Sequence, residues 1–374
     1  MAAAGCLLAA SQAHASPYSD FNIGISLRNS GNCDGAIPRL TAALQAPDLL
    51  ANLRPIAFLV RGFCEAQLKH DEQAIADYGQ AIALEPQRME AYLERGFAYG
   101  RRKEFDAAAA DFSMAVRLRP DLPDAYSGLI YLHIAQKKYD DLVADYDKLV
   151  ALDQNLENAY YDRSEAHALK GDLDAALDDA DAIVSLDRHE TLGFIARGRV
   201  YSHQARFARA EGAFDDALRL EPGNVPALFG KGVAQWSQDN FDDAVATLEA
   251  LAPLSPKDGY TTLWLAIAHA SAHKSNDGLK AWSQTVDRKT WPGPLVGLFA
   301  GESSPDAVLQ AAQASDEVSR DNNLCEAQFY VAEWHLLRSE TAAALPYLHQ
   351  AAQTCPGNNL ERETTSAELK RLKA

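Results

Sequence analysis

Residues 89–122 read MEAYLERGFAYGRRKEFDAAAADFSMAVRLRPDL. Apolar side chains in the first part recur every three or four residues, which predicts a helix from Met89 to Gly100. Residues 101–104 are polar and form a turn, and the same spacing predicts a second helix from Phe105 to Leu118. Pro120 ends the second helix because proline cannot donate the backbone hydrogen bond that a helix interior needs. The stretch is therefore a helix–turn–helix unit of 34 residues.

The same pattern returns every 34 residues. One mostly small column comprises Gly62, Gly96, Ile130, Ser164, Gly198, Gly232 and Ala266. A second small column comprises Ala74, Ala108, Leu142, Ala176, Ala210, Ala244 and Gly278, and a mostly large column comprises Tyr78, Phe112, Tyr146, Ala180, Phe214, Leu248 and Trp282. Small residues let two helices cross closely, and large ones fill the gap to the next pair. Since each pair leaves an apolar face for its neighbour, the sequence predicts an all-α solenoid.

These columns resemble the signature of the tetratricopeptide repeat (TPR) family. Residues 89–122 carry it at Tyr92, Gly96, Tyr99, Ala108, Phe112, Ala115 and Pro120. The resemblance implies a superhelix of α–α hairpins whose first helices line the concave side. The expected segments are a degenerate repeat at 17–50, a tandem array at 55–290, a degenerate helical pair at 291–323, a further repeat at 325–358 and a capping helix at 359–374 with its charges outward.

The first 15 residues, MAAAGCLLAASQAHA, predict a signal peptide cleaved after Ala15, because Ala13-His14-Ala15 has the small-x-small pattern of a cleavage site. The usual basic residues before the apolar run are missing. Two alternatives stay open: Ala4-Gly5-Cys6 as a degenerate lipidation box that would anchor the chain by lipid, and an Ala-rich cytosolic tail. We expect a periplasmic protein, with lipid anchoring as the variant.

Composition narrows the classes of partner. The chain has 374 residues with 35 Lys and Arg against 52 Asp and Glu, a net charge of −17. This acidic excess argues against nucleic acid as the main partner. No apolar run reaches the roughly 18 to 20 residues of a spanning helix, so we expect no transmembrane segment. No metalloprotease, phosphate-binding, hydrolase or paired-cysteine motif occurs, and we expect no enzyme activity, metal or cofactor.

Two recurring sets of polar residues are predicted to be structural. His133, His167, His269 and His335 occupy the column that holds Tyr99 and Tyr201, which indicates a packing role. Arg61, Arg95, Arg163 and Arg197 precede the first small column, and Asp77, Asp111, Asp145 and Asp179 follow 16 residues later. Such a ladder is most simply a set of ion pairs between helices.

Four of the five cysteines remain after removal of a signal peptide, and they allow three pairings. The repeat phase places Cys33 near Cys64, and Cys325 near Cys355, at ends of antiparallel neighbours. We therefore predict the disulfides Cys33–Cys64 and Cys325–Cys355, one at each end of the array. The alternative is four buried free thiols.

The concave side is where TPR proteins bind peptides, so its residues are the candidate site. The inward phases of the first helices hold Phe63, Leu93, Phe97, Arg101, Tyr131, Tyr161, Arg199, Phe229, Trp236 and Tyr260. Aromatic residues with scattered arginines are typical of a peptide- or protein-binding groove. Some of these aromatics are instead expected to serve packing alone.

The C-terminal third resembles the NlpI-like bacterial proteins. The resemblance lies in residues 291–299, in Gly301-Glu302-Ser303-Ser304, and in Cys325-Glu326-Ala327-Gln328-Phe329-Tyr330. It implies a non-catalytic periplasmic adaptor, commonly a dimeric lipoprotein, that links an envelope protease with peptidoglycan hydrolases. A homodimer is accordingly expected. The alternative function is a scaffold for outer-membrane assembly or secretion without protease linkage.

Overall fold

A computed structural model describes residues 16–153, 157–315, 319–355 and 359–374. The described residues form 21 α-helices and no strand, which confirms the all-α TPR solenoid. The expected signal peptide at 1–15 lies outside the described residues. The chain divides into two compact units, unit 1 up to Lys138 and unit 2 from Tyr139 onward.

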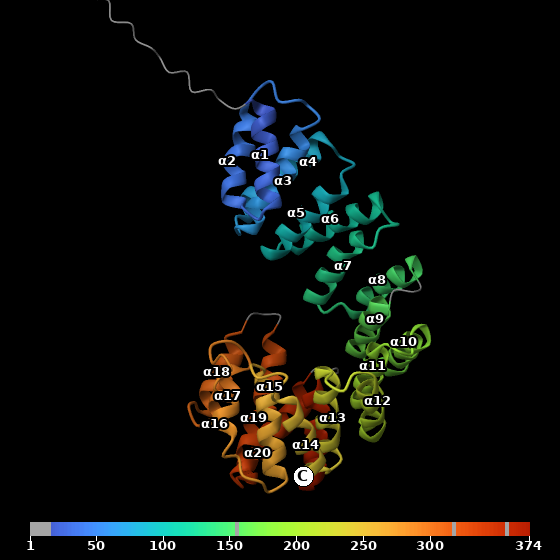
Figure 1. The fold of residues 1–374 in the computed structure, drawn as a ribbon, viewed down its shortest axis with the longest axis vertical. Coiled ribbons are helices and arrows are strands. Elements are labelled where there is room, and N and C mark those ends of the chain that lie inside the picture. Colours follow the sequence, from blue (N-terminus) through green and yellow to red (C-terminus); the bar gives the residue numbers. More distant parts are fainter. Residues whose placement is uncertain (1–15, 154–156, 316–318, 356–358) are drawn as a thin grey trace, which may run out of the picture. The chain divides into compact units, whose positions relative to one another are not determined.

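Unit 1 holds seven helices, coloured blue to green in Figure 1. They are α1 (Pro17–Asn29), α2 (Cys33–Gln45), α3 (Arg54–Gln67), α4 (Asp71–Leu84), α5 (Met89–Arg101), α6 (Phe105–Leu118) and α7 (Asp124–Ala135). Consecutive helices pack as hairpins, α1 with α2, α3 with α4 and α5 with α6.

Unit 2 begins with regular hairpins and then departs from them. Its helices are α8 (Tyr139–Leu152), α9 (Glu157–Lys170), α10 (Leu173–Leu186), α11 (Thr191–His203), α12 (Phe207–Leu220), α13 (Val225–Ser237), α14 (Phe241–Leu251), α15 (Gly259–Ser271), α16 (Leu279–Trp282), α17 (Gly293–Phe299), α18 (Pro305–Gln313), α19 (Arg320–Leu337), α20 (Thr341–Thr354) and α21 (Leu360–Leu372).

The large column fills the centre of each repeat, as its spacing predicts. Phe112 in unit 1 and Phe214 in unit 2 are both buried. Each ring lies between two glycines on the flanking first helices, Gly96 and Gly128 around Phe112, and Gly198 and Gly230 around Phe214. A Cβ atom at any of these glycines would overlap the ring, so the phenyl group occupies the space that a larger residue would need. Two of the four, Gly96 and Gly198, belong to the first small column.

The predicted arginine–aspartate ladder forms within repeats. Arg61 pairs with Asp77 and Arg95 with Asp111, both at 2.7 Å, and Arg163 pairs with Asp179 at 2.6 Å. In each pair two guanidinium nitrogens donate to two carboxylate oxygens, the geometry that makes such pairs strong. Arg197 differs, because it pairs with Asp181 on the preceding helix α10.

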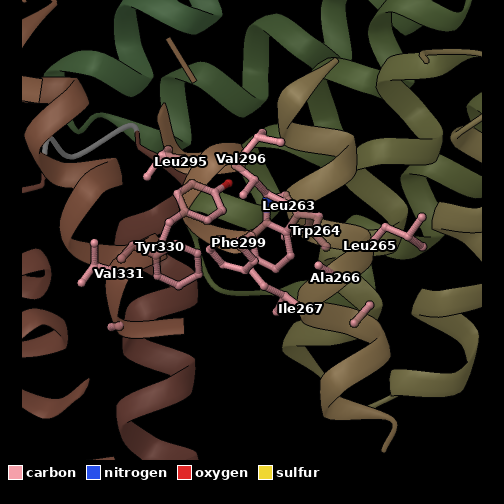
Figure 2. Packing of buried hydrophobic residues seen from close by; sticks show 14 of the residues in the cluster. Leu263, Trp264, Leu265, Ala266, Ile267, Leu295, Val296, Phe299, Tyr330 and Val331 are labelled. Atoms are coloured by element: carbon pink, nitrogen blue, oxygen red, sulfur yellow. The ribbon is translucent and has the colours of Figure 1, made fainter. Parts of the chain in front are cut away.

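The repeat over residues 259–290 lacks a full second helix, contrary to the predicted array. Gly278 and Trp282 were placed on that helix, but it is reduced to α16, Leu279–Trp282. The preceding residues, Ser275-Asn276-Asp277, favour turns over helix. Helices α17 and α19 pack on α15 instead, so that Trp264, Phe299 and Tyr330 meet in one core (Figure 2).

One of the two predicted disulfides forms and the other does not. Cys325 and Cys355 form a disulfide with Cα atoms 4.9 Å apart, as predicted, although Cys325 lies in the second turn of α19 rather than at its start. The predicted Cys33–Cys64 disulfide is wrong, because both cysteines are free and buried. The two thiols do lie next to each other, as the repeat phase predicts, and burial together with a hydrogen bond to Cys33 raises the pKa of Cys64 to about 12. A high thiol pKa disfavours the thiolate that forms disulfides.

The C-terminal helix α21 differs from the predicted cap. Its charges do not all face outward, since Glu361 and Glu368 are buried together with Thr364 and Thr365. Besides α19 and α20, it packs against α11 and α13, more than 100 residues earlier in the chain. Figure 1 shows this red segment next to α13 and α14.

Candidate functional site

The first helices form the inner face of each unit. Successive first helices contact one another, α1 with α3, α3 with α5 and α5 with α7 in unit 1, and α9 with α11, α11 with α13 and α13 with α15 in unit 2. Within the described residues the second helices of successive repeats, such as α4 and α6, make no such contact. The first helices are therefore on the crowded, concave side, where the candidate groove residues were placed.

Three aromatic side chains of unit 1 lie along this face, Phe63 on α3, Phe97 on α5 and Tyr131 on α7. The ring of Phe97 packs edge-on against Tyr131, with centroids 5.8 Å apart, and against the buried Phe112 at 5.1 Å. Tyr131 is 38 % exposed. Phe63 lies under the guanidinium of Arg28, which is 4.3 Å from the ring centroid. On this face Tyr131 is therefore exposed, while Phe63 and Phe97 are half-buried.

The two other predicted residues of unit 1 have additional roles. Leu93 packs beside Phe112 and Met89, so much of its surface serves the core. Arg101 is exposed but donates to Asp71 on α4 at 2.5 and 2.8 Å. A ligand carboxylate at Arg101 would therefore compete with an existing ion pair.

Two charged residues of this face were not predicted, Arg28 and Glu94. Burial raises the pKa of Glu94, while the nearby cations Arg101 and Arg28 act against that rise. The Nε atom of Arg28 is buried without a hydrogen-bond partner in the described part of the chain. The sequence signal for Glu94 is that its equivalents one repeat away, Val60 and Gly128, carry no charge.

The five predicted residues of unit 2 are engaged within the chain. The hydroxyl of Tyr161 accepts from Arg199 at 3.1 Å, and Arg199 also pairs with Glu165 at 2.8 Å. The hydroxyl of Tyr260 donates to Glu326 at 2.6 Å, and Trp236 is fully buried. Phe229 lines a cavity of about 300 Å³ at the start of α21.

Helix α21 explains why unit 2 differs. It contacts α11, α13 and α19, three first helices, and so it lies on the inner face. The inner face of unit 2 is therefore partly covered by α21, although Arg199 on α11 stays exposed, whereas the described part of unit 1 has no such covering helix on its inner face.

The described residues contain no group of three or more His, Cys, Asp or Glu side chains placed to hold a metal ion. Within the same part of the chain, every helix is too short or too polar to cross a membrane. The absence of a metal, a cofactor and a catalytic activity stays a prediction.

Comparisons with known proteins agree with this architecture. A tetratricopeptide repeat family profile matches residues 195–259, and a TPR repeat profile matches residues 65–103. The C-terminal part of a TPR repeat-containing protein from Cytophaga hutchinsonii is 18 % identical, with a TM-score of 0.51 over 59 % of this chain and 89 % of that one. This likeness supports the fold alone.

Two further solved structures have lower TM-scores. A tetratricopeptide repeat protein from Parabacteroides merdae is 14 % identical, with a TM-score of 0.49 over 67 % of this chain and 98 % of that one. MamA is 23 % identical, with a TM-score of 0.40 over 44 % of this chain and 95 % of that one. With one profile match in each unit and the repeat columns in register, the chain is a tetratricopeptide repeat protein.

Proposed function

We propose that this chain is an exported, periplasmic scaffold that binds protein partners on the inner face of unit 1 and brings an envelope protease together with peptidoglycan hydrolases. TPR arrays are typical protein-interaction scaffolds, so the coarse part of this proposal follows from the fold. The observation that carries it is the row of aromatic side chains formed by the exposed Tyr131 and the half-buried Phe97 and Phe63, bordered by Arg28 and Arg101. Aromatic and arginine side chains supply most of the binding energy in protein interfaces.

The disulfide Cys325–Cys355 supports export, because such bonds persist in oxidising compartments such as the bacterial periplasm. The link to a protease and to hydrolases rests on the NlpI-like resemblance of the C-terminal third. Of the residues that carry the resemblance, Leu295 to Phe299 and Cys325 to Tyr330 are buried in the core of unit 2, whereas Gly301, Glu302 and Ser304 are exposed. The resemblance therefore lies mostly in core residues, and the partner must be identified on the surface.

Site-specific photocrosslinking tests the proposal. A benzoylphenylalanine at position 131 is placed on the inner face of unit 1, and a matched control at Leu84 is placed at an exposed position of the second helix α4. We expect crosslinks from position 131, and none from position 84, to an envelope protease or a peptidoglycan hydrolase. The substitutions Phe63→Ala and Arg101→Ala should weaken that crosslink.

Other results would contradict this proposal. Crosslinks only to outer-membrane assembly or secretion components would favour the alternative scaffold. Equal crosslinking from positions 131 and 84 would contradict an inner-face site. A mature protein that still begins with Met1, shown by N-terminal sequencing, would contradict export through signal-peptide cleavage.

A further inference from the structure

Arg371, near the end of α21, is held by α13 and by the start of α14. Its guanidinium carbon lies 4.4 Å from the ring centroid of Trp236 and 5.0 Å from that of Phe241. Its Nε donates to the carboxylate of Asp239 at 2.7 Å, and its Nη2 donates to the backbone carbonyl of Trp236 at 3.2 Å. Its Nη1 donates to Glu368, one turn earlier on α21. The guanidinium of Arg371 therefore packs on aromatic rings and also donates hydrogen bonds to Asp239, Glu368 and the backbone of Trp236.

The pocket occurs in one repeat only. Trp236 stands in a column that otherwise holds mostly small residues: Ala66, Gly100, Ile134, Ala168, Ser202 and Ala270. Asp239 stands at the left-handed turn of its hairpin, with φ of 66°, where the other repeats have Lys69, Lys103, Lys137, Gly171, Ala205 and His273. Neither the tryptophan nor the acid is therefore explained by the requirements of the repeat.

The position on the helix also favours a cation. Trp236 and Asp239 lie at and just after the C-terminal end of α13, where unpaired carbonyls and the helix dipole give a negative potential. A guanidinium over the face of tryptophan adds a cation–π attraction, which is stronger when the cation is partly desolvated. Asp239 itself is exposed, so that the pocket opens to solvent on that side.

Two buried carboxyl groups at the interface of α21 with the rest of unit 2 oppose the packing of this helix. Glu368 of α21 and Glu333 of α19 are both buried, and burial together with the neighbouring Glu368 raises the pKa of Glu333. One oxygen of Glu333 has no hydrogen-bond partner among the described residues. Burying carboxylates with incomplete pairing is costly. The Arg371 contacts therefore have to offset the cost of burying these carboxyl groups, which suits a helix that leaves this interface reversibly.

We propose that Trp236, Asp239 and Phe241 form an arginine-binding pocket on the inner face of unit 2, that Arg371 fills it in cis, and that an arginine on a helical segment of a protein partner displaces it. The partner segment has the chemistry of α21, with a glutamate three residues before the arginine as in Glu368 and Arg371. This site lies in unit 2 and goes beyond the function proposed for unit 1.

The test uses the full chain and a fluorescein-labelled peptide with the sequence of residues 359–374. Binding is measured by fluorescence anisotropy to the wild type, to Arg371→Ala and to Arg362→Ala. The last is the matched control, since Arg362 is an exposed arginine on the same helix. We expect at least about tenfold tighter binding to Arg371→Ala than to the other two, because an occupied site lowers apparent affinity by the fraction that is free.

The peptide must bind through its own arginine. A peptide with alanine in place of Arg371 should bind the Arg371→Ala chain at least about tenfold more weakly than the native peptide. The double variant Asp239→Asn/Arg371→Ala should also lose affinity. Asparagine tolerates the left-handed turn, so this change removes the acid without disturbing the backbone.

Hydrogen exchange gives a second measurement that does not depend on the peptide. In Arg371→Ala the amides of residues 366–372 should exchange faster, while those of α11 and α13 should keep their protection. Unchanged exchange together with equal peptide affinity for all three chains would overturn the proposal, and so would loss of protection throughout unit 2. A concentration-dependent dimer of Arg371→Ala would also overturn it in favour of α21 exchange between copies. None of these results bears on crosslinking at position 131, so the two proposals fail separately.

Discussion

The inner faces of the two units are built from the same repeat but present different surfaces. In unit 1 the rings of Phe97 and Tyr131 pack edge to face, with Phe97 half-buried and Tyr131 exposed. In unit 2 α21 covers the part of the corresponding surface that α11 and α13 form, and Trp236 and Tyr260 form hydrogen bonds within the chain. The comparison shows that repeat phase identifies which residues face inward, whereas a single later helix decides whether they are available.

The largest expected difference between the faces is in stability. Trp236→Ala should lower the free energy of unfolding of unit 2 by about 3–5 kcal/mol, because it leaves a cavity in a fully buried site. Tyr131→Ala removes a ring that is 38 % exposed and should cost unit 1 less than about 1 kcal/mol. Urea unfolding followed by hydrogen exchange of each unit measures both values. Equal losses would mean that the two faces are equally buried.

Reduction of Cys325–Cys355 should destabilise unit 2 alone. The bond closes a loop with a sequence separation of 30 residues, and the loss of its constraint on the unfolded chain corresponds to about 3–4 kcal/mol. Unit 1 should not respond, because its cysteines Cys33 and Cys64 are free. The measurement is the urea midpoint of each unit with and without reductant, and Cys33→Ala is the control. A shift of the unit 1 urea midpoint on reduction would show instead that Cys33 and Cys64 are joined by a disulfide.

The units should also differ in their response to pH. Burial raises the pKa of Glu361 to about 8, with Glu326 nearby, and burial raises the pKa of Glu333 and Glu368 as well. The groups facing them are Tyr330, Arg371 and Asp239. A carboxyl whose pKa is raised on folding binds its proton more tightly in the folded state, so its stabilisation is complete below about pH 4.5 and is lost as the pH rises toward 8.

We therefore expect the free energy of unfolding of unit 2 to be lower at pH 8 than at pH 5 by at least about 1 kcal/mol. This is the effect of one extra proton held by the folded state across about one pH unit. Glu333→Gln should reduce this dependence and stabilise unit 2 at pH 8, because it removes a buried charge. Urea midpoints of both units between pH 5 and pH 8 provide the measurement. A unit 2 midpoint that rises with pH would contradict the assigned burial of these acids.

The repeat and the inner-face phases follow from local spacing, which the sequence shows directly. Gly62, Gly96, Gly198 and Gly232 lie at positions 34 residues, or a multiple of 34, apart, because every repeat packs against its neighbours in the same way. The course of α21 is not local, since its contacts with α11 and α13 join residues more than 100 positions apart. No periodicity encodes such a contact.

Some features that the repeat spacing does not predict are marked in the sequence by residues that depart from the repeat pattern. Trp236 in a mostly small column and Asp239 at a turn that carries no acid in the other repeats both mark the arginine pocket. The reduced helix α16 follows a run of turn-forming residues that was visible in the sequence but was outweighed by the column positions of Gly278 and Trp282. The pairing state of Cys33 and Cys64 depends on chemistry that repeat phase does not report, since proximity alone does not oxidise two thiols.

The smallest expected effect tests how freely the open face of unit 1 can adjust. A Cβ at Gly100 would lie 2.7 Å from Cε1 of Tyr131, while a Cβ at Gly128 would overlap the fully buried ring of Phe112. Tyr131 can rotate toward solvent, so Gly100→Ala should change stability by less than about 0.5 kcal/mol, since the helix propensity of alanine offsets the displacement. Gly128→Ala, the matched control, should cost about 1–3 kcal/mol because Phe112 cannot move. Thermal unfolding of both variants compares them, and a large loss for Gly100→Ala would show that Tyr131 is fixed in place and that the face is less adaptable than its exposure indicates.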